Sequence, residues 1–450
     1  MNVRLIIQKG FVAVLAAMAL SSCDMMTEDL DDCPTGLYVT FVYDYNIQQA
    51  DMFKDHVGGL TLYVYDESDR LVATKTMGAG QLSKYGSYIH FSEAELAPDH
   101  SYRLMAVALQ KDWNTALTTP GAKYRLTGNA AGSEWGQFFI DLDHDATRSA
   151  VAVSPLSATR SCAAVFPQQS ATRAISDYYY VSNAAPLDTL WHTLTTITTP
   201  AAEHPLQYMP AMLTPAKTDY SWQRDGSIKS NGQERVTVVK GEPTYATVSL
   251  IRDTNHLNIV LRALNYDKDS GDYVVDDNQA LDKDYTVEIV DNNAQLDCRN
   301  NLSNPNDTLI YRPYRQWTTS FVGSGEVASE SAAHYDLMFN RLLYKNASVE
   351  NDRYAVLNEA DIAKTRNAVL LIRKASDGEI IFGLNLPYIL SSGRTYQERY
   401  YHYQEYLDRE YDYRLEFIIR GGKVEDIMLW LGTHVHIIPW VLREQHEQLD

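Results

Sequence analysis

The residue with the clearest predicted chemistry is Cys23, which directly follows Leu20-Ser21-Ser22. Two basic residues and an apolar run over residues 11–20 precede this motif, an arrangement typical of a bacterial export signal that ends in a lipobox. In a lipobox the cysteine thiol is diacylated before cleavage. We therefore expect residues 1–22 to be a cleaved signal peptide and Cys23 to carry lipid, such as palmitate. The alternative is an ordinary secreted protein in which Cys23 is incidental.

Lipid on Cys23 would hold the chain on a membrane, because each buried methylene contributes about 0.8 kcal/mol and several acyl chains act together. No later stretch of the sequence is apolar enough to be expected to span a bilayer as a helix. Residues 23–33 carry five acidic side chains and no basic one. This composition predicts a solvated acidic tether rather than a packed element.

The remaining cysteines are Cys33, Cys162 and Cys298. An odd number in an exported chain allows one disulfide with one free thiol, or no disulfide, and the sequence leaves the pairing open. No two of them have the spacing of metal ligands, so we expect no cysteine metal site.

Short catalytic motifs are missing from the sequence. It contains no His-Glu-x-x-His zinc motif, no phosphate-binding Gly-Lys-Ser/Thr loop and no Gly-x-Ser-x-Gly nucleophile elbow. Gly323-Ser324-Gly325 lacks the spacing of an elbow and is interpreted as a loop. We therefore expect neither an enzyme nor a bound cofactor, and a surface hydrolase is the least favoured function.

Candidate metal ligands are incomplete. His434 and His436 would share one face of a strand, but no third ligand is near them in the sequence. The acidic run Asp141–Asp145 begins like a calcium loop, yet Ala146 replaces the glycine that the turn needs, and the run Asp267–Asp272 fails similarly. We predict solvated turns and strand-surface histidines rather than a metal site.

Composition limits the class of partner. The chain of 450 residues has 45% hydrophobic and 22% charged residues, which is typical of a globular protein of two or three domains. Its 39 basic and 58 acidic side chains give a formal net charge of −19. Nucleic acids and anionic membrane surfaces are therefore poor partners for the chain.

The rest of the chain alternates apolar and polar residues with a period of two, which indicates strands. In the first half this pattern recurs at four places, over residues 37–43, 60–64, 102–109 and 137–142. We expect residues 34–250 to form an N-terminal β-sandwich. Within it we expect a long insertion at about 143–235. Residues 143–186 are rich in Ala, Ser and Thr and poor in large apolar residues, so we expect this part to be exposed and cut early by trypsin at Arg148, Arg160 and Arg173. Order is expected to return near Leu187–Trp191 and to firm up at Arg235–Val239.

The second half continues with strand signals. Residues 245–264 contain two strand-like segments joined at Arg252–Asn255, which we interpret as the domain boundary before a C-terminal β-sandwich at 251–450. Residues 368–386 predict a hairpin whose Asp377-Gly378 turn suits type I′ geometry. Residues 400–410 predict a short helix, and strands over 413–419 and 433–440 close the fold. The whole chain is predicted to be all-β.

Several segments together resemble one family. They are Cys33-Pro34 with Gly36-Leu-Tyr-Val-Thr-Phe, the run Val248–Leu261, and Tyr406-Leu407-Asp408-Arg409-Glu410 before a β run that ends at Trp440. With the lipobox, this order resembles the FimB/Mfa-type fimbrial anchor lipoproteins of the Bacteroidales. The acidic tether also resembles the surface-export signal of Bacteroidetes lipoproteins.

The resemblance implies two tandem transthyretin-like β-sandwich domains and a surface-exposed lipoprotein of the cell outer membrane. Such a protein anchors a fimbrium, a cell-adhesion structure, and contacts its shaft subunits through β-strands. The alternative function is a surface glycan-binding lipoprotein, which would need a platform of exposed Trp and Tyr.

Two sheet edges are candidates for the shaft contact. The first is the apolar C-terminal stretch with Ile437, Ile438, Trp440 and Val441, which Pro439 confines to an edge or a bulge. The second is an open edge beside residues 37–43. The alternative for the C-terminal stretch is that it only completes the C-terminal sandwich.

Overall fold

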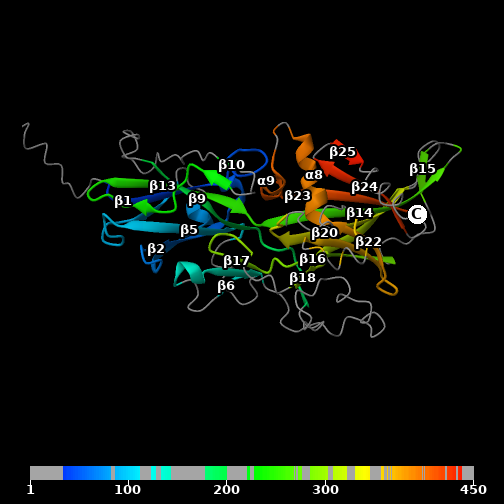
Figure 1. Ribbon diagram of the computed structural model, residues 1–450, viewed down its shortest axis with the longest axis horizontal. Coiled ribbons are helices and arrows are strands. Elements are labelled where there is room, and N and C mark those ends of the chain that lie inside the picture. Colours follow the sequence, from blue (N-terminus) through cyan, green and yellow to red (C-terminus); the bar gives the residue numbers. More distant parts are fainter. Residues whose placement is uncertain are drawn as a thin grey trace, which may run out of the picture.

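Figure 1 shows the protein as a computed structural model. The structure describes residues 34–82, 87–111, 123–127, 133–142, 178–199, 220–222, 228–267, 269, 272–275, 284–302, 308–321, 330–344, 356–358, 362, 365, 367–397, 399, 401–420, 423–431 and 434–437. Almost all regular structure in these residues is β, which confirms the predicted class. The strands form an N-terminal and a C-terminal group along the long axis of the molecule (Figure 1).

The N-terminal half is built on a sheet of eight described strands. In sheet order the main path is β3 (Leu71–Gly78), β2 (Gly59–Tyr65), β5 (Ser101–Leu109), β9 (Leu190–Thr199), β13 (Pro243–Arg252), β1 (Gly36–Val42) and β4 (Ile89–Phe91), and β12 (Val236–Thr237) pairs with β5. Strands β1 and β13 are parallel, with Gly36 opposite Pro243. The first described strand is thus paired with one about two hundred residues later.

Alternation along these strands sets the packing of the sheet. Leu37, Val39 and Phe41 of β1 lie in one apolar cluster with Leu60 and Leu62 of β2, as the sequence predicts. The short helices α2 (Phe53–His56) and α3 (Ala79–Leu82) each contribute a buried residue to this cluster.

A second, smaller layer covers the opposite face of the N-terminal sheet. It consists of β6 (Tyr124–Thr127), β7 (Phe139–Leu142) and β17 (Gln295–Asp297), with the 3-10 turn η4 (Trp135–Gln137) before β7. Phe138 and Ile140 of this layer are buried in one apolar cluster with Met105 and Val107 of β5. The N-terminal half is therefore a two-layer β structure.

The C-terminal half contains two larger sheets. One is ordered β19 (Arg315–Phe321), β20 (Glu330–Asn340), β14 (Thr254–Asp267), β23 (Asp412–Arg420), β24 (Lys423–Leu431) and β25 (His434–Ile437), and β15 (Asp272–Val275) pairs with β14. The other is ordered β22 (Ile380–Asn385), β21 (Val369–Lys374), β16 (Tyr285–Asp291), β18 (Thr308–Tyr311) and β8 (Tyr178–Tyr180). Their inner faces share the apolar cluster that also reaches the N-terminal half.

Two strands cross between the halves, and we call them the exchanged strands. β8 comes from the first half of the sequence but pairs in parallel with β18 of a C-terminal sheet. β17 comes from the second half but pairs with β7 of the N-terminal layer. A cut of the sequence at residue 250 therefore does not separate all strands of the two halves.

The predicted strand-to-strand join at Arg252–Asn255 lies where β13 ends and β14 begins, with Asp253 between them. The predicted helix is α9 (Tyr403–Arg409), which has a capping box made by His402 and Glu405. It follows α8 (Leu386–Ser392) and the turn η9 (Gly393–Tyr396). None of the helices in the described residues is long and apolar enough to cross a membrane.

Part of the expected insertion at 143–235 belongs to the sheets. β9 lies between β5 and β13, and its Trp191 is fully buried. A small hairpin, β10 (Tyr220–Trp222) with β11 (Ile228–Ser230), follows in the same range. β9 begins where order was expected to return, whereas β8 lies in the stretch expected to be exposed and is ordered by its pairing with the distant β18.

The predicted type I′ turn is also wrong. The connection runs from Lys374 to Ile380, and only Gly378 in it has positive φ, at +75°. Asp377 instead accepts a hydrogen bond at Oδ1 from the Glu379 amide at 3.0 Å. A longer loop closed by one left-handed glycine joins these strands, as loops of more than two residues commonly do.

Candidate functional site

The predicted partner-contact residues begin at a sheet edge. Strand β25 pairs with β24, with Ile437 opposite Met428, and no described strand pairs with its other side. Ile438, Trp440 and Val441 lie outside the described residues, as does the proposed lipidation site Cys23. Their roles remain predictions.

The second candidate edge, beside residues 37–43, is closed by β4 over residues 37–39. β1 lies between β13 and β4, and Leu37 to Val39 pair with Phe91 to Ile89. The two ends of this sheet are β3 and β4. They lie close to each other, since the Lys75 ammonium on β3 donates to the His90 carbonyl of β4 at 2.6 Å. Lys75 also pairs with Glu95 at 2.6 Å. This side of the N-terminal sheet is therefore partly closed.

A buried polar cluster lies where the two halves meet. We call it the joint, and it consists of Asp253, Asn300, Arg341, Gln404 and Asp408. Both Asp408 oxygens accept from Arg341 at 2.9 Å, a bidentate pair. Arg341 also donates to the Asn300 carbonyl at 2.5 Å, and Asn300 donates from Nδ2 to Asp253 Oδ1 at 2.7 Å. Gln404 donates to Asp408 Oδ1 at 2.9 Å.

The joint connects elements that are distant in sequence. Asp253 is the single residue between β13 and β14, and Asn300 follows the exchanged strand β17. Asp408 belongs to α9, and Arg341 follows β20. The cluster therefore ties the link between the halves to an exchanged strand and to a C-terminal helix.

The two acids of the joint, Asp253 and Asp408, have different electrostatic surroundings. Burial raises the pKa of Asp253 to about 7, against the lowering effects of Arg341 and of the Asn300 hydrogen bond. Burial lowers the pKa of Arg341, but the Asp408 carboxylate outweighs it and raises that pKa above its usual value. Arg341 is thus neutralised mainly by Asp408, which leaves Asp253 able to hold a proton near neutral pH.

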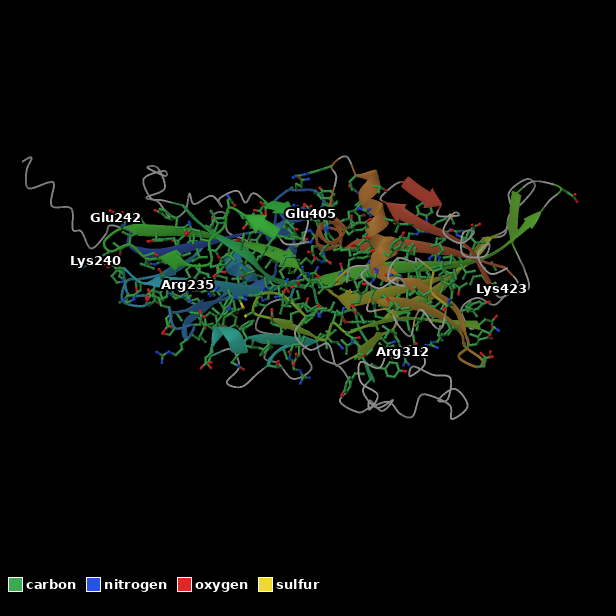
Figure 2. The ribbon with its side chains drawn as sticks, viewed as in Figure 1. Arg235, Lys240, Glu242, Arg312, Glu405 and Lys423 are labelled. Carbon is green, nitrogen blue, oxygen red and sulfur yellow. The ribbon has the colours of Figure 1, made fainter. Side chains whose placement is uncertain are left out.

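A second contact between the halves involves α9. The Ile47 amide donates to the Arg409 carbonyl at 3.2 Å, and Arg409 Nη1 donates to the Asn46 carbonyl at 3.4 Å. The Arg409 guanidinium lies 4.1 Å from the centre of the Tyr45 ring. It also pairs with Glu405, which Figure 2 shows near the middle of the long axis.

A third contact is buried beside the link between β13 and β14. Tyr124 and Thr254 join their hydroxyls at 2.8 Å, and the Leu190 amide donates to the same Thr254 hydroxyl at 3.0 Å. With the exchanged strands and the common apolar cluster, these contacts join the halves without a long linker.

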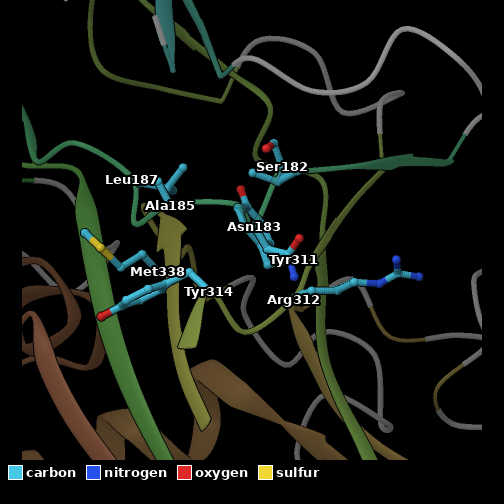
Figure 3. Close-up of a pocket in the computed structure, with 9 residues that line it drawn as sticks. Ser182, Asn183, Ala185, Leu187, Tyr311, Arg312, Tyr314 and Met338 are labelled. Atoms are coloured by element: carbon cyan, nitrogen blue, oxygen red, sulfur yellow. The ribbon is translucent and has the colours of Figure 1, made fainter. Parts of the chain in front are cut away.

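A small pocket lies between the segment after β8 and the segment from β18 to β19 (Figure 3). Its enclosed volume is about 10 Å³, room for about one water molecule. Arg312 at its rim extends away from the other lining residues (Figure 3) and contacts the Tyr180 ring and Glu288. The pocket is too small for an organic ligand.

The remaining candidate residues are the cysteines and the possible metal ligands. Cys298 is a free, half-buried thiol whose pKa burial raises to about 11, which makes it a poor nucleophile. Cys33 and Cys162 lie outside the described residues, so the pairing stays open. No group of three His, Cys, Asp or Glu side chains in the described part of the chain could hold a metal ion. The backbones of His434 and His436 are in β25.

Sequence reasoning missed the joint. Asp253 and Asp408 were visible only as a turn residue and as part of a family-like segment, and nothing in the sequence connected them with Arg341. The one signal in the sequence is the charged pair Arg252-Asp253 between two long apolar runs. Charged residues are rarely buried unless they are paired, so such a position indicates a buried partner.

The comparisons with known proteins point to one family. The sequence model described as fimbrillin-A associated anchor proteins Mfa1 and Mfa2 matches residues 30–205 and 231–446. No curated protein matches the chain.

Among solved structures, a candidate polysaccharide-binding protein from Bacteroides thetaiotaomicron is 19% identical, with a TM-score of 0.53 over 90% of this chain and 98% of its own. A candidate adhesin from the same species is 18% identical, with a TM-score of 0.54 over 91% and 97%. These two likenesses show a common fold. The fimbrial anchor protein Mfa2 from Porphyromonas gingivalis is 11% identical, with a TM-score of 0.42 over 90% and 99%.

Proposed function

Because the chain belongs to the family of fimbrillin-A associated anchor proteins, we propose that it holds a fimbrium on the bacterial outer membrane through lipid on Cys23. The family match over residues 30–205 and 231–446 carries this proposal. Membership makes the chain a fimbrium-associated cell-surface protein; the lipid anchor and the contact with shaft subunits are the proposed parts.

The arrangement of the halves supports an anchoring role. The proposed tether, residues 23–33, directly precedes β1 in the N-terminal half, whereas β25 belongs to the C-terminal half farther along the long axis (Figure 1). A fimbrium attached at the C-terminal half would pull on the membrane through the joint. Buried polar contacts and a shared apolar cluster suit that load better than a flexible linker would.

The edge of the C-terminal sheet supports the proposed shaft contact. An edge strand such as β25 presents backbone N–H and C=O groups that can pair with a strand of another chain. We place the contact at Ile437, Ile438, Trp440 and Val441, where main-chain hydrogen bonds would supply affinity and apolar side chains would set the register.

Substitution of the lipidation site tests the anchor. Cys23→Ala should move the protein out of the membrane fraction and release fimbriae from the cells, because no acyl chain would then hold either. Cys33→Ala is the matched control, ten residues later in the same tether region, and should leave both unchanged. Membrane fractionation and counts of cell-bound fimbriae measure the two effects. A Cys23→Ala protein that still sediments with outer membranes and still retains fimbriae would contradict the proposal.

A further inference from the structure

The outer face of one C-terminal sheet has an unusual set of side chains. Along β14, Leu257, Ile259 and Leu261 lie in the apolar cluster, so the alternate residues His256 and Asn258 lie on the other side. We call the side chains on that other side of β14, β19, β20, β23 and β24 the outer face. An antiparallel sheet commonly presents such a face to water.

Strand register arranges the outer face in two cross-strand rows. The first row is Trp317, His334, Val260, Glu416 and Met428, and the second is Arg315, Asp336, Asn258, Arg414 and Trp430. Each row crosses four strand spacings of about 4.8 Å, or about 19 Å in all. Along the same register, β25 pairs beside Met428 and Trp430, so the face adjoins the open edge.

The central carboxylates of the face are buried beneath it. The side chains of Asp336 and Glu416 are 10% and 4% exposed. Asp336 accepts from Asn258 at 2.8 Å, and Glu416 accepts from the Trp430 indole at 3.1 Å and pairs with Arg262. These two acids are satisfied within the sheet, Glu416 also by Arg414 at 3.9 Å. Asp412, which lies on the same face opposite His256, is 65% exposed and pairs with His256 at 2.7 Å.

Guanidinium groups and aromatic rings lie above these acids. The Arg414 side chain is 40% exposed, and its guanidinium lies 4.7 Å from the centre of the Trp430 ring. At the other end, exposed Arg315 lies 4.5 Å from the centre of the Trp317 ring. Trp317 stacks on His334 with the ring centres 4.8 Å apart and 6° between the planes. Burial and two nearby arginines lower the pKa of His334, so the exposed positive charge comes from arginine.

This combination fits a protein partner with acidic groups. Trp, Arg and Met are enriched at the centres of protein interfaces, whereas Lys is depleted, and neither row contains Lys. The exposed arginines at both ends present positive charge on a chain whose formal net charge is −19. They would complement carboxylates on a partner, and they would repel a basic one.

Stacking of a glycan is less favourable here. Arginine already lies over the ring of each tryptophan, and His334 lies against Trp317, so these rings are engaged within the protein. A face that crosses five strands over about 19 Å, with an adjoining strand edge, suits another folded subunit better than a sugar ring.

We infer that the outer face is a docking surface for an acidic face of a neighbouring fimbrial subunit, with Arg315–Trp317 and Arg414–Trp430 as its two anchors. This inference rests on the proposed function, and it adds a surface to the edge contact proposed there. The adjoining β25 edge would set the register of the partner, and the two arginine–tryptophan pairs would select an acidic one.

Charge reversal tests the docking surface. Arg315→Glu and Arg414→Glu are compared with Lys240→Glu, which makes the same charge change on an exposed residue at the far end of the N-terminal half (Figure 2). The probe is fimbriae sheared from the same cells, and binding to each purified protein is measured at low and high salt. Each arginine reversal should weaken binding about tenfold or more and reduce its salt dependence, and Arg315→Lys should retain most of it. Lys240→Glu should bind like wild type.

The outcomes distinguish failure of the docking surface from failure of the proposed function. If both arginine variants unfold thermally like wild type and still bind fimbriae with wild-type affinity, the docking surface is overturned. Loss of binding to polysaccharide extracted from the same cells, with fimbria binding unchanged, would overturn it in favour of a glycan site. If wild type does not bind fimbriae while Cys23→Ala cells keep theirs, the proposed function fails instead.

Discussion

Asp253 is the single residue between β13 of the N-terminal sheet and β14 of a C-terminal sheet. Its side chain is fully buried, and Oδ2 has no hydrogen-bond partner among the described residues. A protonated carboxyl is less costly to bury than a carboxylate, and burial raises the pKa of this residue to about 7. The residue therefore makes the joint sensitive to pH.

Asp253→Asn should change how stability depends on pH. The folded state holds a proton on Asp253 up to about pH 7, whereas the unfolded state releases it near pH 4. Between these values the folded state binds more protons, so this group stabilises the wild type increasingly as pH falls from about 7 to 4. The asparagine variant should lack this gain. Urea unfolding of both proteins at pH 8 and pH 5 measures it as a difference between their pH dependences.

His192 provides the internal control for that measurement. It is buried on β9, and burial lowers its pKa to about 4, so acid destabilises the folded state through this residue as pH falls from about 6.5 to 4. This opposing effect is present in both proteins and cancels in the comparison. Parallel pH profiles for wild type and Asp253→Asn would show that Asp253 does not titrate in this range.

At the scale of elements, a deletion that begins in β25 distinguishes the two roles considered for the C-terminal stretch, which are contact with the shaft and completion of the C-terminal sandwich. Deletion from Ile437 onward removes only one paired residue of the described strand, so the truncated protein should fold with a wild-type circular dichroism spectrum. If the edge contacts the shaft, the cells should lose most of their fimbriae. Electron microscopy of intact cells measures retention.

The matched control is deletion of residues 443–450 alone, which removes the polar tail and keeps the apolar stretch. It should leave fimbriae in place. A folded, membrane-bound protein truncated from Ile437 that holds fimbriae at the wild-type level would exclude the edge contact, and an unfolded one would assign the stretch to the core.

Local pattern predicts most single strands of this fold but not their partners. The alternation of apolar residues identified β1, β2, β5, β13, β14 and β23, because the period of two depends only on neighbours in the sequence. The parallel pairing of β1 with β13 could not be predicted, since nothing local at Gly36 specifies Pro243. For the same reason the sequence does not predict the pairing of β8 with β18 or the ion pair of Arg341 with Asp408. The candidate edge at Ile437 was predictable because Pro439 limits the pairing of its own strand.

At the scale of the whole molecule, the halves share their core. One apolar cluster contains Tyr63 and Met105 from the N-terminal sheet together with Leu257 and Phe417 from a C-terminal sheet. The exchanged strands add backbone pairing in both directions across the division. The halves are therefore expected to behave as one cooperative unit.

Differential scanning calorimetry should show a single unfolding transition with equal calorimetric and van't Hoff enthalpies. Trp191→Ala, which empties a fully buried site in the N-terminal sheet, should cost about 3–5 kcal/mol and lower the temperature of the entire transition. Two separated transitions, with only the first shifted by this substitution, would show that the halves unfold independently.

The exchanged strands also constrain the order in which the chain can fold. The layer with β7 is incomplete until β17, at residues 295–297, pairs with β7. Likewise β8 cannot pair before β18, at residues 308–311, is available. A chain that crosses a membrane from its N-terminus therefore cannot complete its first half vectorially, before the second half has emerged. Such long-range pairing slows folding and leaves unpaired strand edges exposed in the meantime. In a chain that emerges in this direction, the strand edges of the first half stay unpaired until about residue 311 is available, so any chaperone that protects unfolded chains would have to act until then.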